Sequence, residues 1–192
     1  MKELIYQMKE DYDSILTISF DAYLELFKYL SIRRYKKNEI IKDNSQIEVA
    51  SRYISKGIIA LYDLSLKVPA CRRIYSKSET VCDMESYLTE SITSSKIVAY
   101  TNCIVCELPK ENEFKVIDNI PEFAKLALRI NHRNATNEFR WRRLAWKNKE
   151  NAYLELMQLC PDFSSIKVKD ICTIIDLPER SIYRLRQKLR SN

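Results

Sequence analysis

The chain has 192 residues, of which 46% are hydrophobic and 30% charged, and its formal net charge is +6. This composition excludes a largely disordered chain, and the length allows one large domain or one medium domain with a smaller one. The sequence has no apolar run of about eighteen residues, and acidic residues interrupt the N-terminal stretch MKELIYQMKEDYDS. We therefore expect a cytoplasmic protein with no membrane partner. The basic excess permits nucleic-acid binding without requiring it.

The N-terminal half of the sequence changes from a helical to a strand-like pattern. Residues 1 to about 30 predict a helix, because apolar residues recur there at helical spacing. From Ile32 to about Leu108, short apolar runs alternate with polar breaks such as KKN, DNSQ and TESITSS. This pattern predicts short antiparallel strands in a sandwich or roll. Gly57 is the single glycine, and we expect it at a turn or at a close approach of the backbone.

The six cysteines do not form a convincing metal site. Only Cys103 and Cys106 have CxxC spacing, and the chain has one histidine, His132. A separation of three on a strand places two side chains on opposite faces. We predict that the cysteines are small buried hydrophobic residues, and we expect no metal and no cofactor.

After Pro109 the helical period returns. Pro121 suits the first position of a helix, and an apolar stripe then continues for longer than a typical globular helix. A single small roll is poorly suited to cover so long a stripe, so we predict a homodimer. The alternative is one helix packed on the strand region. The predicted seam comprises Leu126, Ile130, Asn134, Asn137, Trp141 and Leu144.

The C-terminal part predicts a hinge and a pair of helices. The polar run KNKEN at 147–151 predicts the hinge, and a short helix, AYLELMQL, follows it. VKDICTIID and PERSIYRLRQKL then form two segments with helical periodicity, joined by a turn at Asp176-Leu177. Ile182, Leu185 and Leu189 are expected to face inward, which leaves the basic residues of the second segment for solvent or DNA.

The order of these elements resembles the Crp/Fnr family of bacterial transcription regulators. SRYISKGIIALYDL resembles the family's strand pair with a turn glycine, and DMESYLTESITSSKIVAYTNCIVCELPKENEF resembles its phosphate-cassette region and closing strands. PEFAKLALRI is similar to the start of its dimer helix, and AYLELMQLCPDF resembles the variant common in Bacteroidetes. The resemblance implies an α+β fold. It consists of an antiparallel β-roll of the cyclic-nucleotide-binding jelly-roll type at 1–120, a dimerisation helix at 121–150 and a helix-turn-helix domain at 151–192.

The resemblance also implies that PERSIYRLRQKL is a recognition helix and that the partner is double-stranded DNA. Such a helix places its N-terminal residues on base edges, where arginine can bind guanine. Asp176 stands where the family has glycine, and aspartate tolerates a left-handed backbone. The family's β-hairpin wing has no counterpart before Asn192, so we expect modest affinity. The candidate DNA contacts are Arg180, Ser181, Tyr183, Arg184, Arg186 and Lys188, of which Arg180 replaces the usual glutamate.

The effector pocket of the family uses a glycine–glutamate pair and an arginine–serine pair. The matching segment CDMESYLTESITSSK contains neither the glycine nor the arginine. We therefore predict that cyclic AMP and cyclic GMP do not bind, and that the roll holds an unknown small-molecule effector or none. The residues at the pocket positions are Glu85, Ser86, Ser94, Ser95 and Lys96.

Two other function classes compete with DNA binding. A metal-dependent enzyme on a cupin-like roll needs several converging histidine or carboxylate ligands, and the single histidine lies outside the strand region. The sequence contains no nucleophile elbow, glycine-rich phosphate loop or paired catalytic carboxylates, so we expect no enzyme. The remaining alternative is a degenerate family member that acts through protein–protein contacts or senses an unknown small ligand without sequence-specific DNA binding.

Overall fold

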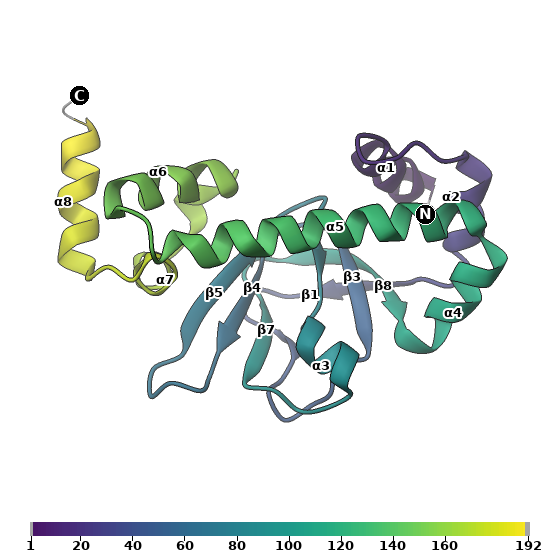
Figure 1. The fold of residues 1–192 in the computed structure, drawn as a ribbon, viewed down its shortest axis with the longest axis horizontal. Helices are drawn as coiled ribbons and strands as arrows, with labels where there is room; N and C mark the ends of the chain where they lie inside the picture. The colour runs from purple at the N-terminus through teal and green to yellow at the C-terminus, as the bar shows by residue number, and fades with distance from the viewer. Residues whose placement is uncertain (1, 191–192) are drawn as a thin grey trace.

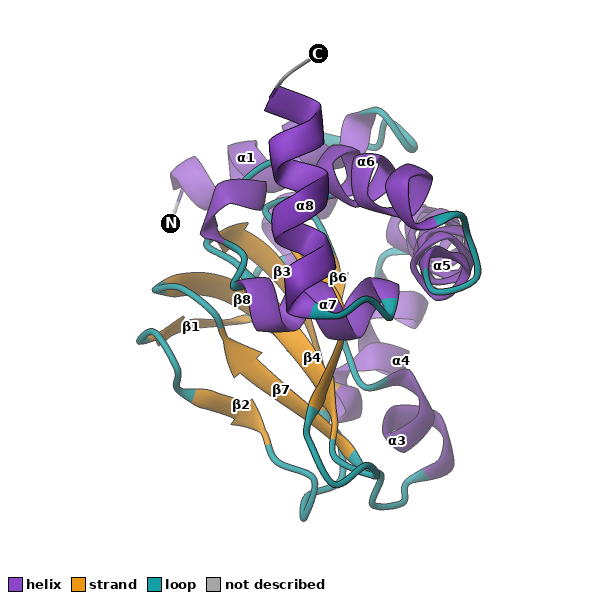
Figure 2. Ribbon diagram, turned by 90° about the vertical axis from the view of Figure 1, so that its left-hand side faces the viewer, coloured by secondary structure: helices purple, strands orange, loops and turns teal. Residues whose placement is uncertain are grey.

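The computed structural model describes residues 2–190, in which two four-stranded antiparallel sheets form a roll with helices along one side and at both ends (Figures 1 and 2). The strands are β1 (Ser31–Tyr35), β2 (Ile40–Lys42), β3 (Ala50–Lys56), β4 (Ile59–Asp63), β5 (Ala70–Tyr75), β6 (Thr80–Val81), β7 (Ser95–Ala99) and β8 (Cys103–Pro109). The helices are α1 (Lys2–Asp13), α2 (Phe20–Leu26), α3 (Met84–Thr89), α4 (Lys110–Asn119), α5 (Pro121–Leu144), α6 (Lys149–Leu159), α7 (Val168–Ile175) and α8 (Glu179–Arg190), with a short 3-10 turn at Phe163–Ser165. The last two residues, where the expected absence of a wing falls, lie outside the described range.

The strand orders are β1-β8-β3-β6 and β2-β7-β4-β5. This is the predicted α+β fold, an antiparallel jelly roll followed by a helical C-terminal region. Side chains alternate across each strand, as the period of two requires. In β3, Ile54 points into the roll, whereas Tyr53 packs with the N-terminal helices. Cys103 and Cys106 likewise lie in different clusters, which confirms that they occupy opposite faces of β8.

Gly57 forms the turn between β3 and β4. Its φ angle is +96°, a conformation that residues with a Cβ rarely adopt. A Cβ atom at this position would lie 2.5 Å from the backbone oxygen of Asn102. Both expectations for this glycine, a turn and a close backbone approach, are therefore confirmed.

The N-terminal segment forms two helices rather than one helix through residue 30. The break falls before Ser19, whose Oγ accepts a hydrogen bond from the backbone N–H of Ala22 and caps α2. Sequence periodicity did not reveal this break, because the apolar residues on both sides of it face the same core. That core joins α1, α2 and the first half of α5.

Helix α5 has 24 residues and runs along the whole roll (Figure 1). It ends at Leu144, and α6 begins at Lys149, where the side chain of Asn148 accepts a hydrogen bond from Glu150 N–H (3.1 Å). The prediction of a hinge at 147–151 is therefore wrong for residues 149–151, which are helical. The connection between the two helices is limited to residues 145–148.

The C-terminal helices share a hydrophobic core with the roll. This core contains Ile58, Cys71 and Tyr100 from the roll together with Ile171 and Ile182 from α7 and α8. The division into 1–120, 121–150 and 151–192 stays a prediction, and buried contacts cross both boundaries.

The cysteines within this fold are mostly buried thiols. Burial raises the pKa of Cys106 to about 11 and that of Cys160 to about 12, so both are protonated at neutral pH. Within residues 2–190, no helix has an apolar stretch long enough to cross a membrane.

Candidate nucleic-acid interface and effector region

Helices α7 and α8 pack together and are joined by a short turn. Asp176 ends α7 in the left-handed conformation (φ 50°, ψ 62°), as predicted for the position where the family has glycine. The N–H of Leu177 then bonds to the carbonyl of Cys172 (3.0 Å), and Pro178 precedes α8. Ile175 and Ile182 are fully buried where the two helices pack together. Leu185 and Leu189 pack against the same core, so the predicted inward face of α8 is confirmed.

The opposite face of α8 is exposed and largely basic. Arg180, Tyr183, Arg184 and Lys188 are exposed, and Ser181 is half-buried. Glu179 is the first residue of α8, and its carboxylate accepts a hydrogen bond from the Tyr183 hydroxyl (3.1 Å). Helix α8 stands at the end of the molecule and projects away from the roll (Figure 1). Its exposed face is therefore open to a large partner.

Two of the six predicted DNA contacts also bond to α6. Arg186 is half-buried, and its Nε donates to the Tyr153 hydroxyl (3.0 Å). Lys188 Nζ lies 2.6 Å from the Glu150 carboxylate but remains exposed. Arg186 therefore helps to hold α8 on α6. Lys149, Ser181, Arg184 and Lys188 surround an open recess of about 300 Å³ beside the helix, with Leu177 and Leu185 also lining it.

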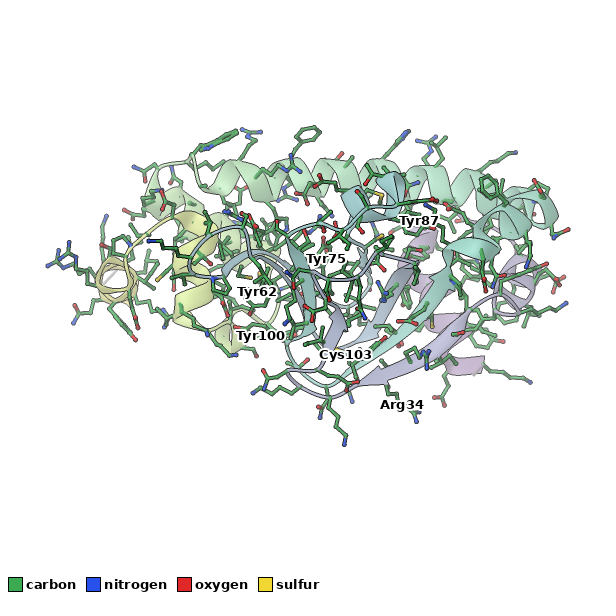
Figure 3. All side chains as sticks on the ribbon, turned by 90° about the horizontal axis from the view of Figure 1, so that it is seen from below. Arg34, Tyr62, Tyr75, Tyr87, Tyr100 and Cys103 are labelled. Atoms are coloured by element: carbon green, nitrogen blue, oxygen red, sulfur yellow. The ribbon has the colours of Figure 1, made fainter. Side chains whose placement is uncertain are left out.

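A buried carboxylate fixes α7 to the roll. Asp170 accepts hydrogen bonds from the hydroxyls of Tyr100 (2.7 Å) and Tyr62 (3.3 Å). Figure 3 shows both tyrosines at the end of the roll nearest the C-terminal helices. The Tyr100 hydroxyl also accepts from Lys167 N–H (2.7 Å), and Thr173 Oγ1 accepts from Cys71 N–H (3.0 Å). These contacts set the orientation of the α7–α8 unit on the roll. No local sequence pattern marks them.

The predicted effector segment surrounds a buried ion pair. Lys42 on β2 is only 2% exposed, and its Nζ lies 2.7 Å from the Asp83 carboxylate. The same Nζ donates to Thr93 Oγ1 (3.1 Å) and to the carbonyl of Ser95 (3.1 Å), and Thr93 donates to Asp83. Thr93, which lies in the segment CDMESYLTESITSSK, therefore serves this internal pair.

A second buried ionic group adjoins the first. Arg52 on β3 donates two hydrogen bonds to Glu48 (2.8 and 2.9 Å) and one from Nε to Glu107 (2.9 Å). Burial alone would lower the pKa of Arg52, but Glu48 and Glu107 outweigh burial and raise it. The N–H of Asp83 donates to Glu48 (3.3 Å), which connects the two groups. Arg33 also lies 3.5 Å from Glu107, so the three carboxylates of Asp83, Glu48 and Glu107 are matched by Lys42, Arg52 and Arg33.

The five predicted pocket residues do not converge on one cavity. Glu85 is exposed, and Ser86 is fully buried, where its Oγ donates to the carbonyl of Ser91 (2.6 Å). Ser94 donates to Asp63 (2.9 Å), and Lys96 lies 3.5 Å from Asp43. Each of these side chains therefore has its own partner or faces solvent. Ser95 contributes its backbone carbonyl, which accepts from Lys42.

The predicted dimer seam is covered by the chain itself. Leu126 and Ile130 pack against the N-terminal helices, and Trp141 and Leu144 pack into the core shared with α7 and α8. All four are at most 7% exposed, and Asn134 and Asn137 are half-buried. The seam prediction overlooked these coverings, because it considered only the roll as a partner for α5. The opposite face of α5 and the segment after it carry Leu128, Phe139 and Trp146, which are 56%, 66% and 84% exposed.

Comparisons with known proteins find similarity at the level of structure. No protein-family model matches the sequence, and no curated protein matches it. The global regulator CLP of Xanthomonas campestris, described as c-di-GMP responsive, aligns with a TM-score of 0.68 at 12% identity over 90% of this chain and 92% of its own. A CooA mutant from Carboxydothermus hydrogenoformans aligns at 0.66 and 13% identity, over 87% and 79% of the two chains. The Thermus thermophilus Catabolite Activator Protein aligns at 0.54 and 16% identity, over 92% and 86%. The chain therefore shares the fold of these proteins.

Proposed function

We propose that the protein is a dimeric, DNA-binding transcriptional regulator of the Crp/Fnr type that is not controlled by cyclic AMP. The exposed basic face of α8 carries this proposal, because Arg180, Tyr183 and Arg184 form its outer surface. Such a helix can enter the major groove with its N-terminal residues at the base edges. The likeness in fold to CLP and to the Catabolite Activator Protein supports a regulator rather than an enzyme.

The roles of the basic residues differ along α8. Arg184 and Arg180 are the proposed base-reading residues, and Lys188 is the proposed phosphate contact, joined by Lys149 across the recess. Arg186 acts mainly through Tyr153, so it positions the helix. Ser181 and Tyr183 lie on the same side of the helix as the arginines and are proposed as secondary contacts.

DNA binding tests this proposal directly. Arg184→Ala is expected to weaken binding to the preferred sequence by about 1–3 kcal/mol and to relax sequence preference. Lys188→Ala is expected to weaken binding to all sequences alike. It should also reduce the slope of log K against log salt concentration by about 0.9, the value for one phosphate contact. Fluorescence anisotropy with labelled duplexes measures both effects, and Lys67→Ala, on the exposed β4–β5 loop, is the control. If the wild type and both α8 variants bind DNA with equal affinity, α8 is not the DNA-binding helix.

The dimer is proposed to form through the outer face of α5. Leu128, Ala135 and Phe139 recur there at spacings of seven and four, and Trp146 follows at a further seven. Large exposed apolar side chains in a row on one helix face are typical of an association surface. A parallel pair of such helices would place the two α8 helices on the same side of the dimer, as a two-fold DNA site requires.

Cyclic nucleotides are expected not to bind the roll. A cyclic phosphate carries a full negative charge, and leaving that charge buried without a cationic partner is costly. Lys42 and Arg52 are occupied by their own carboxylates, so neither is free to hold a phosphate. Calorimetry with cyclic AMP and cyclic GMP at millimolar concentration is expected to show no saturable heat. Saturable binding in the low micromolar range would contradict this prediction.

Protein–protein contact is the second candidate function. It is supported by the large exposed apolar side chains on and beside α3, among them Leu88 and Ile92. If the purified protein binds no duplex DNA at low salt, this candidate replaces DNA recognition.

A further inference from the structure

A cavity of about 260 Å³ lies where the roll, α5 and the C-terminal helices meet. Its walls come from the β5–β6 turn (residues 76–79), the middle of α5 and the segment at the end of α6. It is separate from the buried ionic groups near α3 and from the recess beside α8, because it shares no lining residue with either. Its volume suits a compact metabolite rather than a drug-sized molecule.

The charged side chains that line this junction cavity are mainly cationic. Lys77 comes from the β5–β6 turn, and Arg133 and Arg140 come from α5, where they lie about two turns apart. Glu79 is the acidic lining residue, and it is already paired with the buried Arg73 (3.0 Å) and accepts from Ser76 N–H (2.8 Å). An excess of positive charge therefore faces the cavity.

The cationic groups have unused hydrogen-bonding capacity. Arg133 donates from Nη2 to the carbonyl of Ser78 (3.0 Å), but its buried Nε has no partner among residues 2–190. Arg133 lines the cavity, so its guanidinium group can donate to an acceptor bound there. Lys77 is exposed and makes no ion pair within the described residues. Arg140 reaches only to 3.9 Å from Glu155.

Neutral donors complete the lining of the cavity. Asn137 lies on α5 between the two arginines, and Gln158 lies near the end of α6. Guanidinium, ammonium and amide groups together match the oxygens of a phosphate group, since arginine can donate two parallel hydrogen bonds to them.

We propose that the junction cavity binds a small phosphate-bearing anion, which bridges the roll to the DNA-binding unit. A bound phosphate would contact Lys77 of the roll, Arg133 and Arg140 of α5, and Gln158 of α6. It would thereby fix α6, and with it the α7–α8 unit, relative to the roll. This regulatory consequence rests on the proposed DNA-binding function, whereas the binding site itself does not. An anion that prefers one orientation of α6 shifts the population toward it.

Calorimetry with pyrophosphate at physiological salt tests the site without DNA. The wild-type protein is expected to bind saturably, and Lys77→Gln and Arg140→Gln are each expected to weaken binding about tenfold, the loss of one charge-assisted contact. Lys67→Gln and Arg184→Gln are matched controls, on the β4–β5 loop and on α8, and both should bind as the wild type does. Arg133 also packs over the Tyr12 ring and so contributes to the fold, which is why Lys77 and Arg140 are the residues replaced.

Three outcomes would overturn the proposal. They are no saturable binding to the wild type, equal binding by Lys77→Gln and Arg140→Gln, or loss of binding in Arg184→Gln, which would place the anion on α8. Succinate serves as a second probe, and tighter binding of this dicarboxylate than of pyrophosphate would overturn the phosphate class. Anisotropy with DNA then tests the coupling. If the protein binds pyrophosphate but no DNA, the anion site in the junction cavity is supported and the proposed DNA-binding function is refuted.

Discussion

Arg52→Ala is expected to destabilise the protein by about 3–5 kcal/mol, because it leaves two buried carboxylates without their partner. The Arg52 side chain is 5% exposed, and its guanidinium makes three hydrogen bonds of 2.8–2.9 Å to Glu48 and Glu107. Urea unfolding followed by circular dichroism measures the loss. A domain of this size has a typical stability of about 5–15 kcal/mol, so the change should be large and easily resolved.

Two further variants separate charge from packing. Arg34→Ala, at an exposed position on β1 of the same sheet (Figure 3), is expected to change the free energy of unfolding by less than about 0.5 kcal/mol. The triple variant Arg52→Met, Glu48→Gln, Glu107→Gln removes the charges together, and it should recover part of the stability. If the free energy of unfolding of Arg52→Ala is within about 1 kcal/mol of the wild-type value, the ion-pair network does not stabilise the roll.

The second large effect is expected on the oligomeric state. At micromolar concentration the wild-type protein should scatter light as about twice its 22.8 kDa chain mass. Leu128→Asp with Phe139→Asp places like charges opposite each other across the proposed two-fold axis, and should raise the dissociation constant roughly a hundredfold or more. Both side chains are exposed in the single chain, so the fold should survive.

The control for the dimer variant is Val68→Asp. Val68 is equally apolar and exposed but lies on the β4–β5 loop, so its replacement should leave the dimer intact. A wild-type protein that is monomeric at these concentrations would contradict the dimer. A double variant that remains dimeric would place the interface elsewhere.

The apolar stripe of α5 shows what helical periodicity can and cannot predict. The periodicity around Leu126 and Trp141 correctly predicted a long helix with one buried face. It could not say what covers that face, because the helices that cover it, α1, α2, α6, α7 and α8, are separate elements elsewhere in the sequence. The outer stripe was missed because His132, Arg142 and other polar residues are interspersed with its apolar side chains.

Local patterns predicted the turns and the last two helices more completely. Asp176 adopts the expected left-handed backbone, and Gly57 lies at the expected turn with a positive φ angle, since both conformations depend on the residue itself. The inward face of α8 also followed from spacing alone. Contacts between distant residues were beyond such reasoning. Asp170 bonds to Tyr100 and Tyr62 across 70 and 108 positions, and no local pattern marks those pairs.

The sequence predicted only part of the effector region. The missing arginine and glycine in CDMESYLTESITSSK were visible, but Lys42 and Arg52, which lie on β2 and β3, were not considered. A charged residue at an inward position of a strand was the available signal, since Arg52 and Ile54 share the inner face of β3. A charged residue at such a position is expected to form an internal ion pair or to bind a ligand. Arg52 forms the ion pair, because Glu48 and Glu107 lie within hydrogen-bonding distance.

Selection of bound fragments from a random pool of duplex DNA, followed by sequencing, tests the central claim most directly. A dimer that reads DNA through α8 should enrich an inverted repeat whose half-sites are centred about one helical turn, or a multiple of it, apart. Arg184→Ala should lose preference at one base pair, symmetrically in each half-site. No enrichment above the starting pool, or an identical preference in the wild type and in Arg184→Ala, would contradict the account.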